Sequence, residues 1–120
     1  MTALSKEVSE NGVMVVSFSD SKILDEVRIQ QIGLELMELP EISGGKLLLD
    51  FQGVTFMSSA MIGKILLLSK KCQSSDVVMK VCGMSDRIRD CFKITKLKMG
   101  ILKDRETAVA SFDKKKSWFR

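Results

Sequence analysis

The sequence predicts an α/β domain: a mixed sheet of four to five strands with an antiparallel edge hairpin, and about four helices. Short apolar runs typical of strands alternate with longer segments of helical periodicity, as in parallel strand–helix–strand units. Asn11-Gly12 separates two apolar runs near the N-terminus and indicates a hairpin. The 120 residues, 45% hydrophobic and 28% charged, have the length and composition of one globular domain.

The first third of the chain supplies the hairpin and the first helix. We expect antiparallel strands at Leu4–Val8 and Val13–Phe18, the first of them at the sheet edge. A helix is expected over about Asp25–Leu39, ended by Pro40 because proline disfavours helical backbone in the residue before it. Two apolar stripes on this helix predict contacts with the sheet and with a neighbouring helix: Ile29, Ile32, Leu36 and Leu39 in one, Val27, Leu34 and Met37 in the other.

The rest of the chain repeats strand and helix. In order we expect a buried strand at 46–51, a helix from Ser58 to about Ser74, a strand at 77–82, a helix from Ser85 to about Thr95, a short strand at 99–102, and a helix capped by Asp104 that runs through Phe112. Such units pair their strands in parallel with right-handed crossovers, so the helices should lie mainly on one side of the sheet.

Residues 1–112 then make one domain, and 113–120 make a basic tail that includes Trp118 and Phe119. Three lysines at a terminus are more typical of a solvated tail than of a nucleic-acid contact, so no direct nucleic-acid partner is expected.

The most informative stretch is Asp50 to Cys72, DFQGVTFMSSAMIGKILLLSKKC. A buried strand ends at Asp50, Gly53 breaks it, and helical periodicity begins at Ser58. The first amides of a helix lack internal partners and carry the positive end of the helix dipole. One serine there can cap those amides, while the next has a freer hydroxyl that could accept a phosphate. The plain alternative is that Ser58 and Ser59 only cap the helix.

Composition excludes several kinds of site. The chain has no His, which removes His-dependent triads and His metal sites. Cys72, Cys82 and Cys91 are odd in number and match no metal spacing, so we expect buried thiols in a reducing compartment, no metal and no cofactor. No apolar run is long enough to span a membrane and the N-terminus has no secretory pattern, which favours the cytoplasm and no membrane partner.

Three segments of the chain resemble the STAS domains, specifically the bacterial anti-sigma factor antagonists. LLLDFQGVTFMSSAMIGKIL is similar to that family's strand, Val-x-Phe loop and Asp-Ser-Ser/Thr-Gly-Leu-Gly helix start. VVMKVCGMSDRIRDCFKITKL is similar to its next strand, turn and helix, and DRETAVASF to its terminal helix. The resemblance covers most of residues 13–112, with several motifs in the right order and spacing.

The resemblance implies a switch protein without catalytic residues of its own. In that family the unmodified domain binds an anti-sigma factor that is also a serine kinase, and the sigma factor is released. Phosphorylation of a serine at the start of the central helix breaks the complex, and a phosphatase resets it. That serine falls on Ser59, with Ser58 as the alternative, and the acid that ends the family's strand falls on Asp50. We expect Met57, Met61 and Met84, near the same loop end, to form an adaptable contact patch with Ser58 and Ser59, or else to fill the core.

Two residues depart from the family pattern. Ser58 stands where the family has an acid, and Met61 where it has a glycine. Loss of the acid alters what a kinase would recognise, which keeps open a second hypothesis: a protein-interaction module that is never phosphorylated. A third hypothesis, a small enzyme acting at the helix start, is disfavoured by the absence of His and of a metal cluster in the sequence. The sequence leaves the sigma factor, the kinase and the oligomeric state unspecified.

Overall fold

The structure is a computed structural model that describes residues 3–93 and 100–114. Its strands are β1 (Leu4–Val8), β2 (Met14–Phe18), β3 (Lys22–Ile23), β4 (Lys46–Asp50), β5 (Phe56–Met57), β6 (Val78–Cys82) and β7 (Gly100–Leu102). Its helices are α1 (Glu26–Ile42), α2 (Ser59–Ser74), α3 (Asp86–Lys93) and α4 (Arg105–Lys114). The expected α/β class, the edge hairpin and the four helices are therefore confirmed.

Five strands form the main sheet in the order β1-β2-β4-β6-β7. β1 and β2 are antiparallel, with Val8 opposite Met14, while β2, β4, β6 and β7 are parallel neighbours. The turn of the hairpin is closed by the Ser9 N–H, which donates to the Val13 carbonyl over 2.9 Å, and Gly12 supplies a φ of 82°. β4 lies at the centre, as a strand of the sequence KLLLD with four buried residues should.

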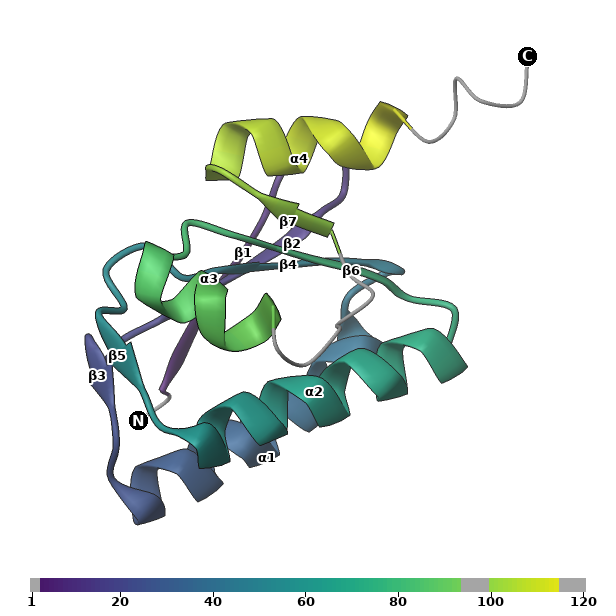
Figure 1. Cartoon of the computed structure of the whole chain (residues 1–120). Helices are drawn as coiled ribbons and strands as arrows, with labels where there is room; N and C mark the ends of the chain where they lie inside the picture. The colour runs from purple at the N-terminus through teal and green to yellow at the C-terminus, as the bar shows by residue number, and fades with distance from the viewer. Residues whose placement is uncertain (1–2, 94–99, 115–120) are drawn as a thin grey trace.

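Helices cover both faces of this sheet unequally. Figure 1 shows α1, α2 and α3 below the sheet and α4 alone above it. The larger apolar core lies beneath, where α1 and α2 pack on Val16, Leu47, Leu49 and Val81. A smaller core lies under α4, where Ala108 and Phe112 pack on Val15, Leu48 and Cys82. Alternate residues of β4 thus reach opposite layers, as the pleat of a strand requires.

Pro40 does not end α1, contrary to the sequence-based expectation. The helix continues to Ile42 and is capped by Ser43. Pro40 removes the one helical hydrogen bond that its own N–H would have donated, but only two residues of the helix follow it. The Ser43 hydroxyl donates to the Pro40 carbonyl over 3.0 Å and so satisfies a carbonyl of the helix end.

The second apolar stripe of α1 is likewise not buried against a helix. Val27 and Leu34 are 77% and 72% exposed, and Met37 is half-buried. α1 meets α2 instead through Gly33, where an added Cβ would stand 3.0 Å from Cδ of the Lys64 side chain. The first stripe, Ile29, Ile32, Leu36 and Leu39, is buried as expected.

Three expected segments lie partly outside the described residues. They are the end of the helix expected to reach Thr95, the start of the strand expected at Met99, and the tail with Trp118 and Phe119. α4 extends through Lys114, two residues beyond the expected boundary at Phe112. Within the described part of the chain, no helix is both long enough and apolar enough to cross a membrane.

Candidate functional site at the start of α2

The strand–loop–helix stretch turns sharply where β4 ends. The Phe51 N–H donates to the Cys82 carbonyl over 2.8 Å, and the Val54 N–H then donates back to the Phe51 carbonyl over 2.9 Å. Gly53, with a φ of 91°, makes this turn possible. The chain leaves the central strand of the sheet, passes through β5 and enters α2 at the edge of the molecule.

A second, two-stranded sheet fixes this passage and was not foreseen from the sequence. β5 pairs in parallel with β3, with Ile23 opposite Met57 and Lys22 opposite Phe56. Strands of two residues carry no readable apolar period, so sequence patterning could not have found them. The Ser58 N–H also donates to the Ile23 carbonyl over 3.1 Å, which carries the pairing up to the first residue before α2.

Ser58 and Ser59 occupy different positions at the helix start. Ser58 is the N-cap, and its Oγ accepts the Met61 N–H over 3.4 Å. Ser59 is the first residue of α2 and is exposed. Serine and aspartate are equally good N-caps, so Ser58 meets the structural need that an acid would meet there. The expectation that the second serine has the freer hydroxyl agrees with this arrangement.

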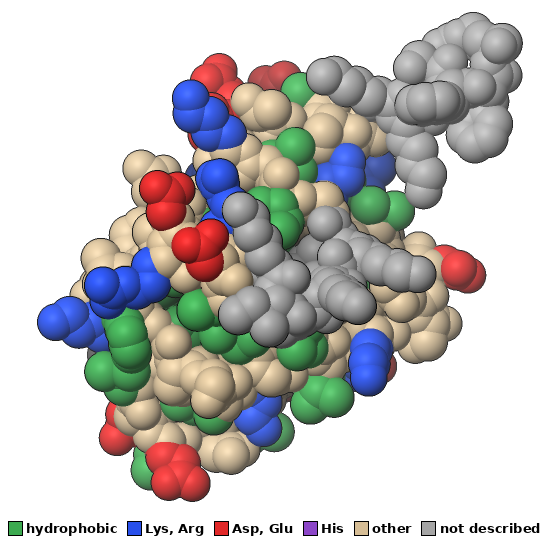
Figure 2. All heavy atoms as spheres, viewed as in Figure 1, with side chains coloured by type: hydrophobic (Ala, Val, Ile, Leu, Met, Phe, Trp, Pro, Cys, Tyr) green, Lys and Arg blue, Asp and Glu red, His purple; other side chains and the backbone are tan. Residues whose placement is uncertain are grey.

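The strand just before Ser59 places an aromatic side chain beside basic ones. Phe56 is 38% exposed, and the Arg87 guanidinium carbon of α3 lies 6.0 Å from the centre of its ring. Lys22, opposite Phe56 on β3, is also exposed. Figure 2 shows Lys and Arg side chains beside hydrophobic ones at this end of the molecule. Sequence reasoning missed Phe56 and Arg87, because their proximity depends on the packing of α3 against β5.

The methionines expected to form a contact patch are buried instead. Met57, Met61 and Met84 are 6%, 0% and 7% exposed and belong to the large core. Met61 lies on the same side of α2 as Ile65 and Leu68, which are also fully buried. The structure therefore corrects the first of the two alternatives. These three residues fill the core beneath the site, whereas Phe56, just before it in the chain, is exposed.

Asp50, expected to support the site, anchors the turn below it. Its side chain is 4% exposed; Oδ1 accepts the Gln52 N–H over 3.0 Å, and Oδ2 lies 2.9 Å from Nε of Arg105 on α4. Arg105 also donates to Ser17 over 3.1 Å and pairs with Glu7. The hydrogen bond that Arg105 donates to Asp50 raises the pKa of the Arg105 guanidinium. Arg105 could not be identified as a partner of Asp50 from the sequence, because the two residues meet only in the fold.

Burial raises the pKa of two cysteine thiols in this part of the fold. Burial raises the pKa of Cys82 to about 12, with the adjacent Asp50 charge adding to the shift, and raises the pKa of Cys72 to about 11. Among the described residues, no three His, Cys, Asp or Glu side chains are grouped closely enough to hold a metal ion.

The arrangement at the start of α2 suits an added anion. The first turn of α2 contains no acidic residue, so the partial positive charge of its amides is not offset by a side chain of that turn. A phosphate on the exposed Ser59 would lie at this end of the helix, where the free amides favour a negative charge. The same change would add about 1.5 to 2 negative charges to this end of the helix.

Comparison with known proteins points to one family. A family model described as the STAS domain matches residues 4–109, which is most of the chain. A search of the curated proteins found no match.

Three solved structures share the architecture. The anti-sigma factor antagonist SpoIIAA in its unphosphorylated form has a TM-score of 0.70 at 15% identity, covering 93% of this chain and 98% of that one. The phosphorylated form of the Bacillus cell fate determinant SpoIIAA has a TM-score of 0.72 at 16% identity, covering 92% and 99%. A serine-to-glutamate variant of RsbS from Moorella thermoacetica has a TM-score of 0.77 at 12% identity, covering 94% and 97%. At these identities the likeness establishes the fold.

Proposed function

We propose that this chain, which belongs to the STAS domain family, is an anti-sigma factor antagonist controlled by phosphorylation of Ser59. In its unmodified form it binds an anti-sigma factor that is also a serine kinase, and the sigma factor is released. Phosphorylation of Ser59 ends the binding, and a phosphatase restores it. The protein acts in the cytoplasm as a regulator and catalyses no reaction itself.

The observation that carries the proposal is the contrast between the two serines. Ser59 is exposed at the first position of α2, whereas Ser58 is half-buried and its Oγ is engaged in capping. A kinase can reach the hydroxyl of Ser59 without unfolding the start of the helix. The similarity to solved antagonist structures, one of them in a phosphorylated form, supports the same proposal.

Electrostatics explains how one phosphate could act as a switch. Within the free protein the new charge lies at a helix N-terminus, where it is tolerated. Within a complex the same charge would be removed from water against the partner surface, at a cost of several kcal/mol unless a cation meets it there. Phosphorylation therefore weakens binding while leaving the fold in place.

The test uses the full chain immobilised as wild type, Ser59→Ala, Ser59→Asp and, as a matched control, Ser58→Ala. Each is incubated with lysate of the source bacterium, and retained proteins are quantified by mass spectrometry. We expect a protein with a serine kinase domain to be retained by the wild type, Ser59→Ala and Ser58→Ala and to be lost with Ser59→Asp. With ATP added, we expect phosphate on Ser59 of the wild-type chain.

A second candidate is a STAS interaction module that is never phosphorylated. It is favoured by Ser58, which stands where the family has an acid before the phosphoacceptor. Equal retention of the same partner by wild type, Ser59→Ala and Ser59→Asp, with no phosphate on either serine, would support this module and reject the switch.

A further inference from the structure

The start of α2 is held by the segment between β2 and α1 as well as by its own strand. The Ser21 carbonyl accepts the Thr55 N–H over 2.7 Å, the Thr55 hydroxyl over 3.2 Å and the Phe56 N–H over 3.3 Å. The Ile23 carbonyl accepts the Ser58 N–H over 3.1 Å. Residues 55–58 therefore donate four hydrogen bonds to two carbonyls of the segment between β2 and α1.

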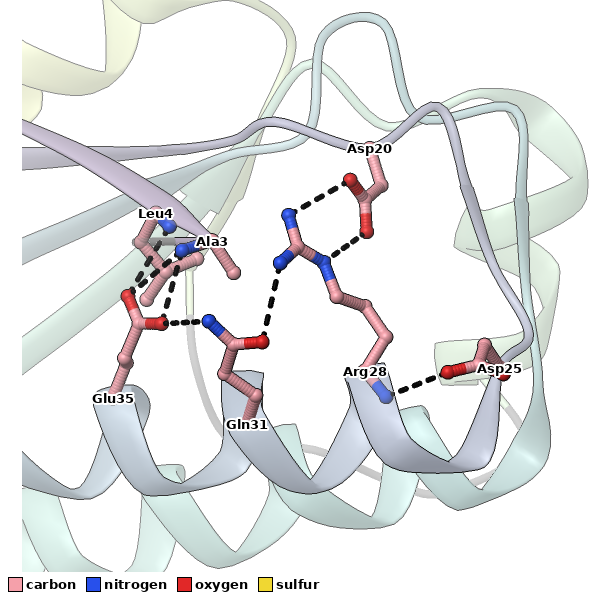
Figure 3. Close-up of polar contacts among 7 residues, drawn as sticks. All are labelled: Ala3, Leu4, Asp20, Asp25, Arg28, Gln31 and Glu35. Atoms are coloured by element: carbon pink, nitrogen blue, oxygen red, sulfur yellow. Dashed lines mark hydrogen bonds and ion pairs between the residues drawn. The ribbon is translucent and has the colours of Figure 1, made fainter. Parts of the chain in front are cut away.

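That segment is in turn fixed by one side chain of α1. Figure 3 shows Arg28 reaching from the first turns of α1 to Asp20, which lies on the segment. Nε of Arg28 lies 2.7 Å from Oδ2 of Asp20, and Nη2 lies 3.1 Å from Oδ1. Asp25, at the other end of the segment, caps α1 by accepting the Arg28 N–H over 2.9 Å.

We propose that Arg28 is a positioning residue for the helix start that presents Ser59, acting through Asp20 and the Ser21 and Ile23 carbonyls. The inference deepens the proposed function, because it rests on Ser59 being the acceptor. It adds a role for a residue in α1, 31 positions earlier in the chain, that does not itself contact Ser59 in any hydrogen bond of the structure's described part.

The geometry of the pair suits positioning. A guanidinium that makes two parallel bonds to one carboxylate fixes both the distance and the orientation of its partner, which a single ammonium cannot do. Nη1 of Arg28 also donates to Oε1 of Gln31 over 3.2 Å, so the side chain is held from both sides. The cap by Asp25 does not use the Arg28 side chain, so α1 should still start at the same residue when that side chain is changed.

A second polar residue of α1 offers a matched control. Glu35, two turns after Arg28, accepts the Ala3 N–H over 3.0 Å and the Leu4 N–H over 3.2 Å. Figure 3 shows it holding the start of β1, away from Asp20. A substitution of Glu35 thus disturbs a polar contact of α1 at a different place. Its link to Arg28 runs through Gln31, whose Nε2 donates to Oε2 of Glu35 over 3.5 Å.

The experiment measures amide hydrogen exchange by NMR on the full chain. The variants are Arg28→Gln, Arg28→Lys, Asp20→Asn, the charge exchange Asp20→Arg with Arg28→Asp, and the control Glu35→Gln. We expect the Thr55, Phe56 and Ser58 amides to exchange about two- to five-fold faster in Arg28→Gln and Asp20→Asn. In Arg28→Lys the exchange rates of these amides should lie between those of the two variants and the wild type. The charge exchange should restore protection, and Glu35→Gln should speed exchange mainly at Ala3 and Leu4.

Two outcomes would overturn the proposal. One is unchanged exchange at Thr55, Phe56 and Ser58 in Arg28→Gln. The other is an equal rise at core amides such as Leu48 and Val81, because that would indicate a general loss of stability. Exchange does not depend on a kinase, so this test stands even when lysate and ATP leave no phosphate on Ser59 and the proposed switch fails.

A second readout applies when the kinase activity in the lysate does modify Ser59. A displaced acceptor hydroxyl should lower kcat/KM for phosphorylation by about ten-fold in Arg28→Gln, mainly through kcat, with little change in Glu35→Gln. An unchanged kcat in Arg28→Gln would contradict the positioning role.

Discussion

Nε of Arg105 lies 2.9 Å from Oδ2 of Asp50 and joins the last helix to the end of the central strand. The two residues are 55 positions apart, and the carboxylate is 4% exposed. Because Oδ1 of Asp50 also accepts the Gln52 N–H, this ion pair supports both α4 and the turn that leads to Ser59. A buried carboxylate needs such a partner to remain ionised at low cost.

Substitution of Arg105 should therefore destabilise the protein. We expect Arg105→Met to lower the free energy of unfolding by about 2–3 kcal/mol, measured by urea denaturation, because Asp50 is left charged and unpaired. Adding Asp50→Asn should recover part of the loss. Glu7→Gln, which removes the exposed partner of Arg105, should cost less than about 0.5 kcal/mol. A double variant less stable than Arg105→Met would contradict this explanation.

Two glycine-to-alanine substitutions should change the stability of the protein in opposite directions. At Gly83, φ is 71° and a Cβ would lie 2.7 Å from Oδ1 of Asp50 and 2.8 Å from the Gln52 nitrogen. We expect Gly83→Ala to destabilise by about 2 kcal/mol or more, since both backbone strain and a clash with the turn result. Gly63 lies within α2 with open space around it, so Gly63→Ala should stabilise by about 0.5–1 kcal/mol. Thermal unfolding of both variants gives the comparison.

Substitution of the two serines at the helix start should affect stability differently. Ser58→Ala removes the N-cap and should cost about 0.5–1 kcal/mol, towards the lower end for caps because the hydrogen bond is 3.4 Å long. Ser59→Ala changes an exposed side chain and should stay within about 0.5 kcal/mol of the wild type. If chemical denaturation gave equal losses for both, the assignment of Ser58 as the cap would be wrong.

Thiol reactivity should follow burial. With the pKa of Cys72 near 11 and that of Cys82 near 12, about one thiol in a thousand or fewer is ionised at pH 8. We expect iodoacetamide to label the partly exposed Cys91 first in the native protein, and the other two only after urea is added. Mass spectrometry of tryptic peptides resolves the three sites. Early labelling of Cys82 would show that the layer under α4 opens readily.

Acid should weaken the cap of α4. The Thr107 N–H, which donates to Oδ1 of Asp104 over 2.8 Å, lowers the pKa of that carboxyl below its ordinary 3.8. A carboxyl with a lowered pKa in the folded state stabilises the protein above the ordinary value, and that contribution is lost as the pH falls through the folded value. Asparagine caps equally well without titrating, so Asp104→Asn should flatten the stability curve between about pH 5 and pH 2. Identical slopes in urea titrations of both proteins would refute this.

Much of the fold could be predicted because its signals are local. The alternation of short apolar runs with helical stripes located every strand of the main sheet and all four helices to within a few residues. Pro40 led to a wrong prediction of the end of α1, because the helix tolerates the loss of one hydrogen bond there and continues for two more residues. β3 and β5 were missed because two-residue strands exist only as a pair.

The candidate site was predictable in position but not in composition. Ser58 and Ser59 could be placed at the helix start from the change of apolar period alone. Whether Met57, Met61 and Met84 lie outside or inside depends on how α2 and α3 pack, and the structure buries them. The same packing brings Arg87 over the exposed ring of Phe56, three residues before Ser59.

The sequence by itself determined the order of elements, the parallel core of the sheet and the junction at which Ser59 begins α2. These features follow from secondary-structure propensities and from the spacing of apolar residues, both of which are local properties of the chain. The tertiary structure decided which side chains face water at that junction, and it brought Asp20 to Arg28 and Asp50 to Arg105. The reason is physical: burial and ion pairing arise between segments that meet only after the chain has folded.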